Sequence, residues 1–238
     1  MIPSKIYYVW FGNKPLPQKS REYIKGWKKL NPTFDIIEIN ENNFDFNKYK
    51  FSRKAFKEKK WAFVSDVARL DAIYNNGGFY FDIDVELLKP INILQKYKSV
   101  WALENSDAIN SGLILGAEKY NKNIGSILDI YKNKEFKSTS YDSVCIPIVS
   151  GYFRKQGFKN KNKLQVLKDQ TIILPSDFFA PYHYWGGGRI TGRTIGIHHY
   201  AANWDTGKLP LSTKIKRELV FRIPSIYYGI RKILKINL

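Results

Sequence analysis

Cysteine is nearly absent from this chain of 238 residues, in which Cys145 is the single example. An internal disulfide framework is therefore excluded, which is consistent with a reducing cytoplasm. No run of about 18 consecutive apolar residues occurs, so no membrane-spanning helix is expected. The N-terminus lacks a charged segment followed by a long apolar run, so no signal peptide is expected either. These absences predict a cytoplasmic protein.

Acidic residues are also scarce, since 21 Asp and Glu face 39 Lys and Arg and give a formal net charge of +18. Such a charge favours polyanionic partners: nucleic acid, an anionic membrane face or phosphorylated substrates. A Lys- and Asn-rich coding bias would give the same composition. The basic residues are spread along the chain and no nucleic-acid-binding signature is present. We therefore expect no nucleic-acid partner, and keep a non-enzymatic nucleic-acid-binding protein as the alternative.

The segment 61–86 organises the rest of the chain. Its first half has apolar residues at helical spacing, and Asn and Gly at 75–78 then favour a helix end. Residues 79–86 alternate between apolar and polar side chains, which predicts a strand with two unlike faces. The helix and the strand should meet at a tight glycine turn.

Two aspartates of the predicted strand, Asp82 and Asp84, project to the same side, with Cα atoms roughly 7 Å apart if the strand is extended. Carboxylates this close repel each other unless a cation lies beside them. Oxygen ligands of this kind suit Mg²⁺ or Mn²⁺, often completed by substrate phosphates. A solvated edge strand with acids on its outer face is the alternative.

Asp66 and Arg69 lie three positions apart on the preceding helix, and therefore on one helical face. Such a pair is most often a surface salt bridge worth less than about 1 kcal/mol. Near a metal-bound diphosphate, the acid and the guanidinium could instead bind sugar hydroxyls and ribose or phosphate oxygens.

The fold class predicted is α/β, with a mostly parallel central sheet flanked by helices. A strand at 5–12, a helix at 20–30 and a strand at 34–39 follow one another with short connections, which is how a parallel sheet begins. We expect one domain over residues 1–207 and a basic tail over residues 208–238.

Several motifs together resemble the family 32 glycosyltransferases. They are S-D-V-A-R-L-D at 65–71, G-G-F-Y-F-D-I-D-V at 77–85, I-Y-Y-V-W-F-G at 6–12 and H-H-Y-A-A-N-W at 198–204. The resemblance spans residues 2 to about 205 and extends more distantly to the glucosyltransferase domains of large clostridial toxins. It implies a GT-A fold, a retaining and metal-dependent reaction, and a D-x-D that anchors the metal and the diphosphate.

The resemblance also implies a third metal ligand five positions before a tryptophan, which selects His199 ahead of Trp204. His198 is the alternative, because adjacent residues on a strand face opposite ways and only one can point into a cleft. The expected metal ligands are thus Asp82, Asp84 and His199, and Trp204 is expected to close over the diphosphate.

Further donor contacts are implied by the same resemblance. Trp10 is expected to stack on the nucleotide base, with a core tryptophan as the alternative, while Asp66 and Arg69 orient the donor and Asp84 acts in catalysis. The loop at 110–112 would approach the transferred sugar, with an ordinary turn as the alternative.

The implied reaction takes a sugar from a nucleotide diphosphate sugar, UDP in the first instance, to a glycan or lipid-linked saccharide. Its expected place is surface polysaccharide biosynthesis, of capsule, lipopolysaccharide or lipooligosaccharide. A toxin-like protein glycosyltransferase is another alternative, which the lack of a recognisable delivery region disfavours.

The tail differs in character from the rest of the chain, because residues 208–238 hold eight Lys or Arg and one acid, Glu218. Its apolar residues at helical spacing, with basic residues beside them, are typical of an interfacial helix on an anionic membrane. The alternative is a helix packed on its own domain. The residues concerned are Ile226, Ile230, Ile233, Arg231, Lys232 and Lys235.

Overall fold

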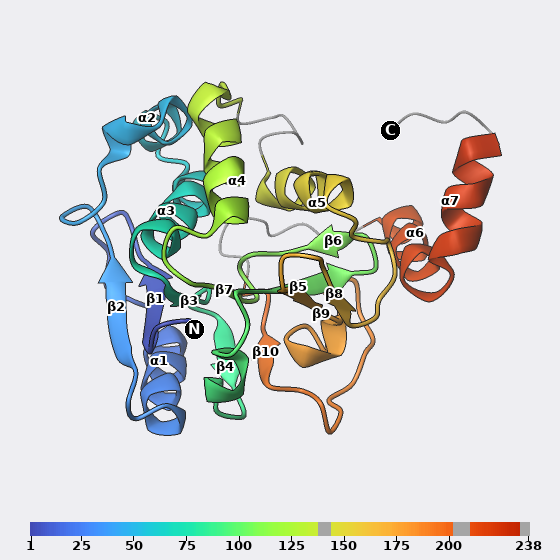
Figure 1. Ribbon diagram of the computed structural model, residues 1–238, viewed down its shortest axis with the longest axis horizontal. Coiled ribbons are helices and arrows are strands. Elements are labelled where there is room, and N and C mark those ends of the chain that lie inside the picture. The colour runs from blue at the N-terminus through green and yellow to red at the C-terminus, as the bar shows by residue number, and fades with distance from the viewer. Residues whose placement is uncertain (138–143, 202–209, 234–238) are drawn as a thin grey trace.

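The computed structural model of the chain describes residues 1–137, 144–201 and 210–233. It is organised around a sheet of eight strands in the order β2-β1-β3-β7-β5-β9-β8, with β6 paired to β5 (Figure 1). These strands are β1 (Lys5–Val9), β2 (Asp35–Ile39), β3 (Gly78–Tyr80), β5 (Ser99–Asn105), β6 (Ala108–Ile109), β7 (Leu115–Ala117), β8 (Gln165–Val166) and β9 (Thr171–Leu174).

Most strands of this sheet run in one direction. β1 pairs parallel with both β2 and β3, and β5 pairs parallel with β9. β7 lies antiparallel between β3 and β5, which therefore share a direction, while β6 and β8 run the opposite way. The predicted mixed α/β fold with a mostly parallel central sheet is confirmed.

Helices cover both faces of the sheet. Successive strand residues point to opposite sides, and in the central strands both sets are apolar, so each face needs a cover. In β5, Trp101 and Leu103 pack into the core beneath the upper helices of Figure 1, while Val100 and Ala102 face the core on the side of α1. The helices are α1 (Gln18–Leu30) on the lower face, and α2 (Lys50–Lys57), α3 (Trp61–Asn76), α4 (Lys122–Asn133) and α5 (Cys145–Lys155) on the upper face.

The predicted helix end after residue 75 is confirmed at Gly77. This residue adopts a positive φ of 65°, and its N–H donates to the carbonyl of Ile73 at 2.8 Å. A Cβ atom there would lie 2.8 Å from the Pro3 ring and 2.9 Å from the Lys119 nitrogen. Only glycine therefore allows α3 to turn so sharply into β3.

A second, smaller sheet pairs β4 (Val85–Leu87) with β10 (Gly196–His198) in antiparallel fashion. Helix α1 packs against it, and the indole of Trp27 donates a buried hydrogen bond to the carbonyl of Val85 at 2.8 Å. Single-turn 3-10 helices span Phe46–Lys48, Asn92–Leu94 and Ser176–Phe178.

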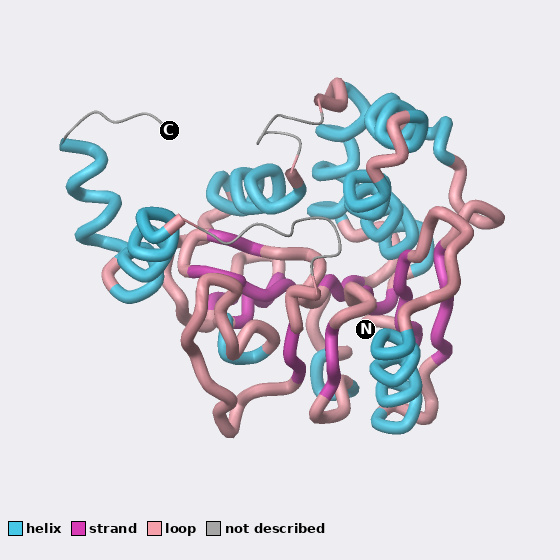
Figure 2. The backbone as a smooth tube through the Cα atoms, turned by 180° about the vertical axis from the view of Figure 1, so that it is seen from behind, coloured by secondary structure: helices cyan, strands magenta, loops and turns pink. Residues whose placement is uncertain are grey.

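Helices α6 (Leu211–Arg222) and α7 (Pro224–Ile233) lie at the end of the molecule opposite β2, as both Figure 1 and Figure 2 show. Within residues 1–137, 144–201 and 210–233, no helix combines the length and the apolar character needed to cross a bilayer.

Candidate active site

A turn, rather than one extended strand, brings Asp82 and Asp84 together. β3 ends at Tyr80, and the N–H of Val85 donates to the carbonyl of Asp82 at 3.0 Å before β4 begins. The prediction of a single strand over 79–86 was therefore wrong. The alternating pattern is shared by two short strands that belong to different sheets, and the two aspartates occupy the link between them.

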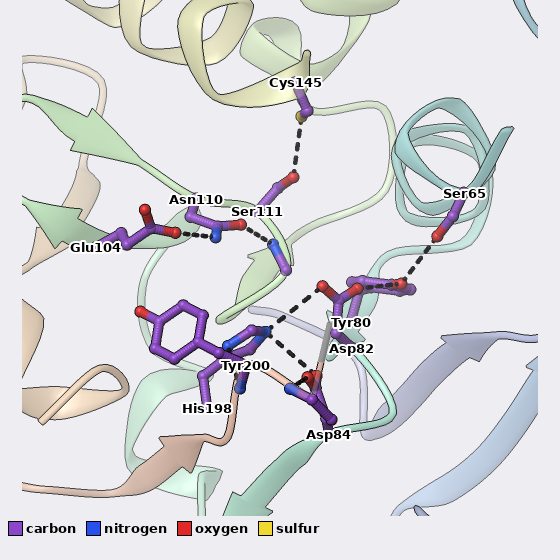
Figure 3. Close-up of polar contacts among 12 residues, drawn as sticks. Ser65, Tyr80, Asp82, Asp84, Glu104, Asn110, Ser111, Cys145, His198 and Tyr200 are labelled. Carbon is purple, nitrogen blue, oxygen red and sulfur yellow. Dashed lines mark hydrogen bonds and ion pairs between the residues drawn. The ribbon is translucent and has the colours of Figure 1, made fainter. Parts of the chain in front are cut away.

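His198 completes a group with these aspartates. β10 places it opposite Val85, the residue that follows Asp84. Its Nε2 lies 3.2 Å from Oδ1 of Asp84 and 3.7 Å from Oδ2 of Asp82 (Figure 3). One ligand atom from each of the three side chains lies within 4.8 Å of the others.

His199 points to the other side of β10. Its Nε2 lies 2.8 Å from Oε2 of Glu86, and its ring stacks on Tyr23 with centroids 4.9 Å apart. The structure thus brings the alternative histidine, His198, to the aspartates and turns His199 away. This differs from the choice made on spacing to Trp204, which lies outside the described residues.

The group formed by Asp82, Asp84 and His198 fits a divalent cation. His198 is buried, and its Nε2 has no hydrogen-bond partner in the part of the chain that the structure describes. Burial alone would lower the pKa of His198, but Asp82 and Asp84 raise it. Two carboxylates and an imidazole are a donor set that divalent ions accept, and carboxylates suit Mn²⁺ and Mg²⁺.

Arg69 links the predicted helical pair to this group. Its guanidinium lies 2.9 Å from Oδ1 of Asp66 and 3.3 Å from Oδ1 of Asp82, and 4.8 Å from the centre of the Tyr80 ring. Burial alone would raise the pKa of the Asp82 carboxyl, yet Arg69, His198 and the Tyr80 hydroxyl hold it below its usual range. Arg69 therefore keeps Asp82 ionised although its carboxylate is partly buried.

Asp66 lies on the far side of Arg69 and is not part of the three-residue group. Burial raises the pKa of its carboxyl to about 7, although Arg69 opposes this shift. Its carboxylate also accepts a hydrogen bond from the backbone of Cys145. Because this ion pair is largely buried, it differs from the exposed salt bridge considered as the alternative. Its contact with a donor stays a prediction.

Trp10 follows β1 at the edge of the sheet where Asp82 follows β3. Since β1 and β3 are parallel, with Tyr7 opposite Tyr80, the chain after β1 emerges beside the chain that leads to Asp82. Trp10 is half-buried and borders a hollow of about 280 Å³ that Lys14, Glu38 and Asn40 also line. Its ring is therefore accessible to a ligand, and base stacking stays a prediction.

The sequence did not single out Glu104, a buried carboxylate at the end of β5. It accepts a hydrogen bond from the Asn110 side chain at 2.6 Å, and Asn110 Oδ1 accepts from the N–H of Gly112 at 2.8 Å. The carbonyl of Gly112 accepts in turn from the N–H of Asp82 at 2.9 Å. A chain of hydrogen bonds thus joins Glu104 to the aspartate, and Figure 3 shows its first link, between Glu104 and Asn110. An acid directly after the apolar run 100–103 was the available signal.

Tyr80 was also missed as a functional residue. Its hydroxyl donates to Oδ1 of Asp82 at 2.7 Å and lies 3.3 Å from the hydroxyl of Ser65. With Arg69 it fixes the orientation of the Asp82 carboxylate, and its place two positions before the D-x-D could have pointed to it.

Gly112→Ala is expected to displace the Asp82 carboxylate and so weaken Mn²⁺ binding by roughly tenfold or more. This is the size of effect seen when a metal ligand loses an outer-shell partner. A Cβ atom on Gly112 would overlap Oδ2 of Asp82, lie 2.8 Å from its Cγ and 3.1 Å from the Arg69 guanidinium. The φ of Gly112 is not positive, so alanine strains the contact and not the backbone. Titration calorimetry with Mn²⁺ measures the effect.

Gly26→Ala is the matched control, since a Cβ atom there meets nothing within 4 Å. It should bind Mn²⁺ as the unaltered chain does. Equal Mn²⁺ affinity of the two variants would show that the loop at 110–112 does not position Asp82.

Residues 17–101 match the family described as "Glycosyltransferase sugar-binding region containing DXD motif". The match supports a glycosyltransferase. It includes Asp82 and Asp84, which are the D-x-D of this chain, together with Asp66 and Arg69. A comparison with curated protein sequences gave no match.

Solved structures similar to this chain include two glycosyltransferases. The first, "PaToxG Glycosyltransferase", superposes with a TM-score of 0.55 at 16% identity, over 65% of this chain and 68% of that one. The second is a glycosyltransferase involved in the glycosylation of the major capsid of PBCV-1, with a TM-score of 0.45 at 10% identity, over 82% and 93%. The first superposition is a likeness of fold, and it agrees with the GT-A type predicted above.

Proposed function

We propose that this protein is a metal-dependent, retaining glycosyltransferase of family 32, distantly related to the clostridial toxin domains. It transfers a sugar from a nucleotide diphosphate sugar to a hydroxyl of a glycan or lipid-linked saccharide. The observation that carries the proposal is the grouping of the two D-x-D aspartates with the buried imidazole of His198.

The roles of the residues follow from their positions. Asp82, Asp84 and His198 would hold Mn²⁺ or Mg²⁺, which supplies Lewis-acid stabilisation of the diphosphate leaving group. Arg69 neutralises Asp82 and, with Asp66, orients the donor. We assign the third ligand to His198 and not to His199, because Nε2 of His198 lies 3.2 Å from Oδ1 of Asp84.

Retention of configuration is part of the proposal because the resemblance to the family 32 glycosyltransferases implies it. The acceptor hydroxyl would attack the anomeric carbon from the face that the diphosphate leaves, as the carbon–oxygen bond to the diphosphate breaks. The hydroxyl proton would pass to the leaving diphosphate oxygen. Front-face displacement of this kind requires the acceptor and the leaving group to share one opening, and Trp10 would hold the base at its rim.

The cellular setting proposed is surface polysaccharide biosynthesis, of capsule or lipopolysaccharide, with UDP as the nucleotide. Peripheral contact of residues 208–238 with an anionic membrane is also part of the proposal. Support for that contact comes from the basic composition of the tail, which holds one acid.

Incubating the purified chain with a panel of nucleotide sugars tests the function. We expect hydrolysis of a UDP-sugar with Mn²⁺ or Mg²⁺ and none with EDTA. In the same series, Trp10→Ala should bind free UDP more weakly, since base–aromatic stacking is worth about 1–3 kcal/mol. Absence of hydrolysis for every donor with either ion would contradict the function, and unchanged UDP affinity in calorimetry would give Trp10 a purely structural role.

A further inference from the structure

An exposed apolar row runs along α6 and α7. In α6 its members are spaced four residues apart, so that they share one helical face. In α7, Ile226 and Ile230 are likewise exposed and four residues apart. The exposed fractions are 72% for Leu211, 53% for Ile215, 41% for Leu219, 40% for Ile223, 56% for Ile226 and 51% for Ile230. We name these six residues the α6–α7 face.

The α6–α7 face does not hold the helices on the domain, because other side chains do so. Val220 is buried, and the ring of Phe221 lies 4.4 Å from that of His183. Glu218 accepts a hydrogen bond from the indole of Trp185 at 2.9 Å, and Tyr228 donates to Asp107. Surface helices normally turn their apolar stripe toward the core, so this outward face is left for a partner.

The charge around the face selects the kind of partner. Lys214, Lys216 and Arg222 are exposed beside it. Glu218 is the single acid among residues 208–238, and it is already engaged by Trp185 and Arg222. Exposed apolar side chains flanked by cations match an anionic lipid interface, in which apolar groups enter the acyl boundary and cations meet headgroups.

We propose that the α6–α7 face docks on an anionic lipid surface, which assigns the membrane contact of the tail to these six side chains. This contact rests on the face itself, whereas its use in presenting a lipid-linked acceptor rests on the proposed function. α6 is fixed to the chain that follows β5: the Ser106 hydroxyl, two residues after Glu104, donates to the carbonyl of Phe221 at 3.0 Å. Docking therefore holds the end of β5 near the lipid.

Sedimentation of the full chain with phospholipid vesicles tests the proposal. We expect binding to vesicles containing about a third phosphatidylglycerol and little binding to pure phosphatidylcholine. Ile215→Asp should weaken binding at least about tenfold even at low salt, because burial of one such side chain is worth about 1.5–3 kcal/mol. Leu211→Asp, at the most exposed position of the face, should act in the same way.

Ile93→Asp is the matched control, since Ile93 is 61% exposed and lies in the 3-10 turn at 92–94, outside the α6–α7 face. It should bind vesicles as the unaltered chain does. Charge reversal at Lys214 and Lys216 should weaken binding at low salt, and salt should remove that difference. Donor hydrolysis by Ile215→Asp should be unchanged, and Asp84→Asn should still bind vesicles.

Three results would overturn the proposal. The first is equal binding of Ile215→Asp, Leu211→Asp and the unaltered chain. The second is an equal loss in Ile93→Asp, which would indicate non-specific attraction. The third is a dimer that Ile215→Asp dissociates without any change in vesicle binding, which would assign the face to a second copy of the chain. Because vesicle binding is measured without donor, each result is independent of whether the chain transfers sugar.

Discussion

Replacing Asp84 with asparagine is expected to abolish donor hydrolysis and sugar transfer, lowering the rate by more than about a hundredfold. Loss of an outer-shell partner already lowers metal affinity or activity roughly 10–100-fold, and Asp84 is proposed as a direct ligand. The carboxylate lies 3.2 Å from His198, and its second oxygen accepts a hydrogen bond from the N–H of Ala201 at 2.9 Å. An asparagine oxygen can keep one such bond, so the fold should be retained.

Donor hydrolysis, Mn²⁺ calorimetry and circular dichroism together measure this outcome. Asp129→Asn is the matched control, because Asp129 is an exposed acid on the surface of α4 that forms an ion pair with Lys132. It should behave as the unaltered chain does. Full activity of Asp84→Asn, or equal activity of the unaltered chain in EDTA, would exclude the metal mechanism.

The second large effect is expected at His198, and it separates the two adjacent histidines. His198→Ala should lose Mn²⁺ affinity and activity by more than about a hundredfold, because it removes the one nitrogen ligand of the group. His199→Ala should retain activity within a few fold, since it removes only a contact with Glu86 and a stack on Tyr23.

A cavity at buried His198 could also lower stability, so His198→Gln accompanies the alanine variant. Glutamine fills more of the space and offers an oxygen ligand, and we expect it to recover part of the Mn²⁺ affinity. Thermal unfolding with and without Mn²⁺ provides a second readout, because a bound ion raises the midpoint only where the site is intact. Loss of Mn²⁺ binding in His199→Ala, with His198→Ala unaffected, would restore the choice made from the sequence.

The sequence by itself determined the elements that depend on local spacing. Period and capping predicted α3 and its end at Gly77, and the i,i+3 rule placed Asp66 beside Arg69, which the structure shows at 2.9 Å. Alternation and β-branched residues predicted β1 and β2, and with the helix between them the α/β class. The D-x-D pair is likewise local, because two residues with a single residue between them cannot lie far apart in any conformation.

Only the tertiary structure decided which side chains join that pair. His198 and His199 have the same chemistry and face opposite sides of β10, and the pairing of His198 with Val85 selects the one that points inward. Glu104 and Gly112 reach Asp82 through hydrogen bonds and a close backbone approach between segments distant in the sequence. Such contacts depend on strand register and on how the two sheets meet. They could not be predicted from the sequence, because the periodicity within a single segment indicates neither of these.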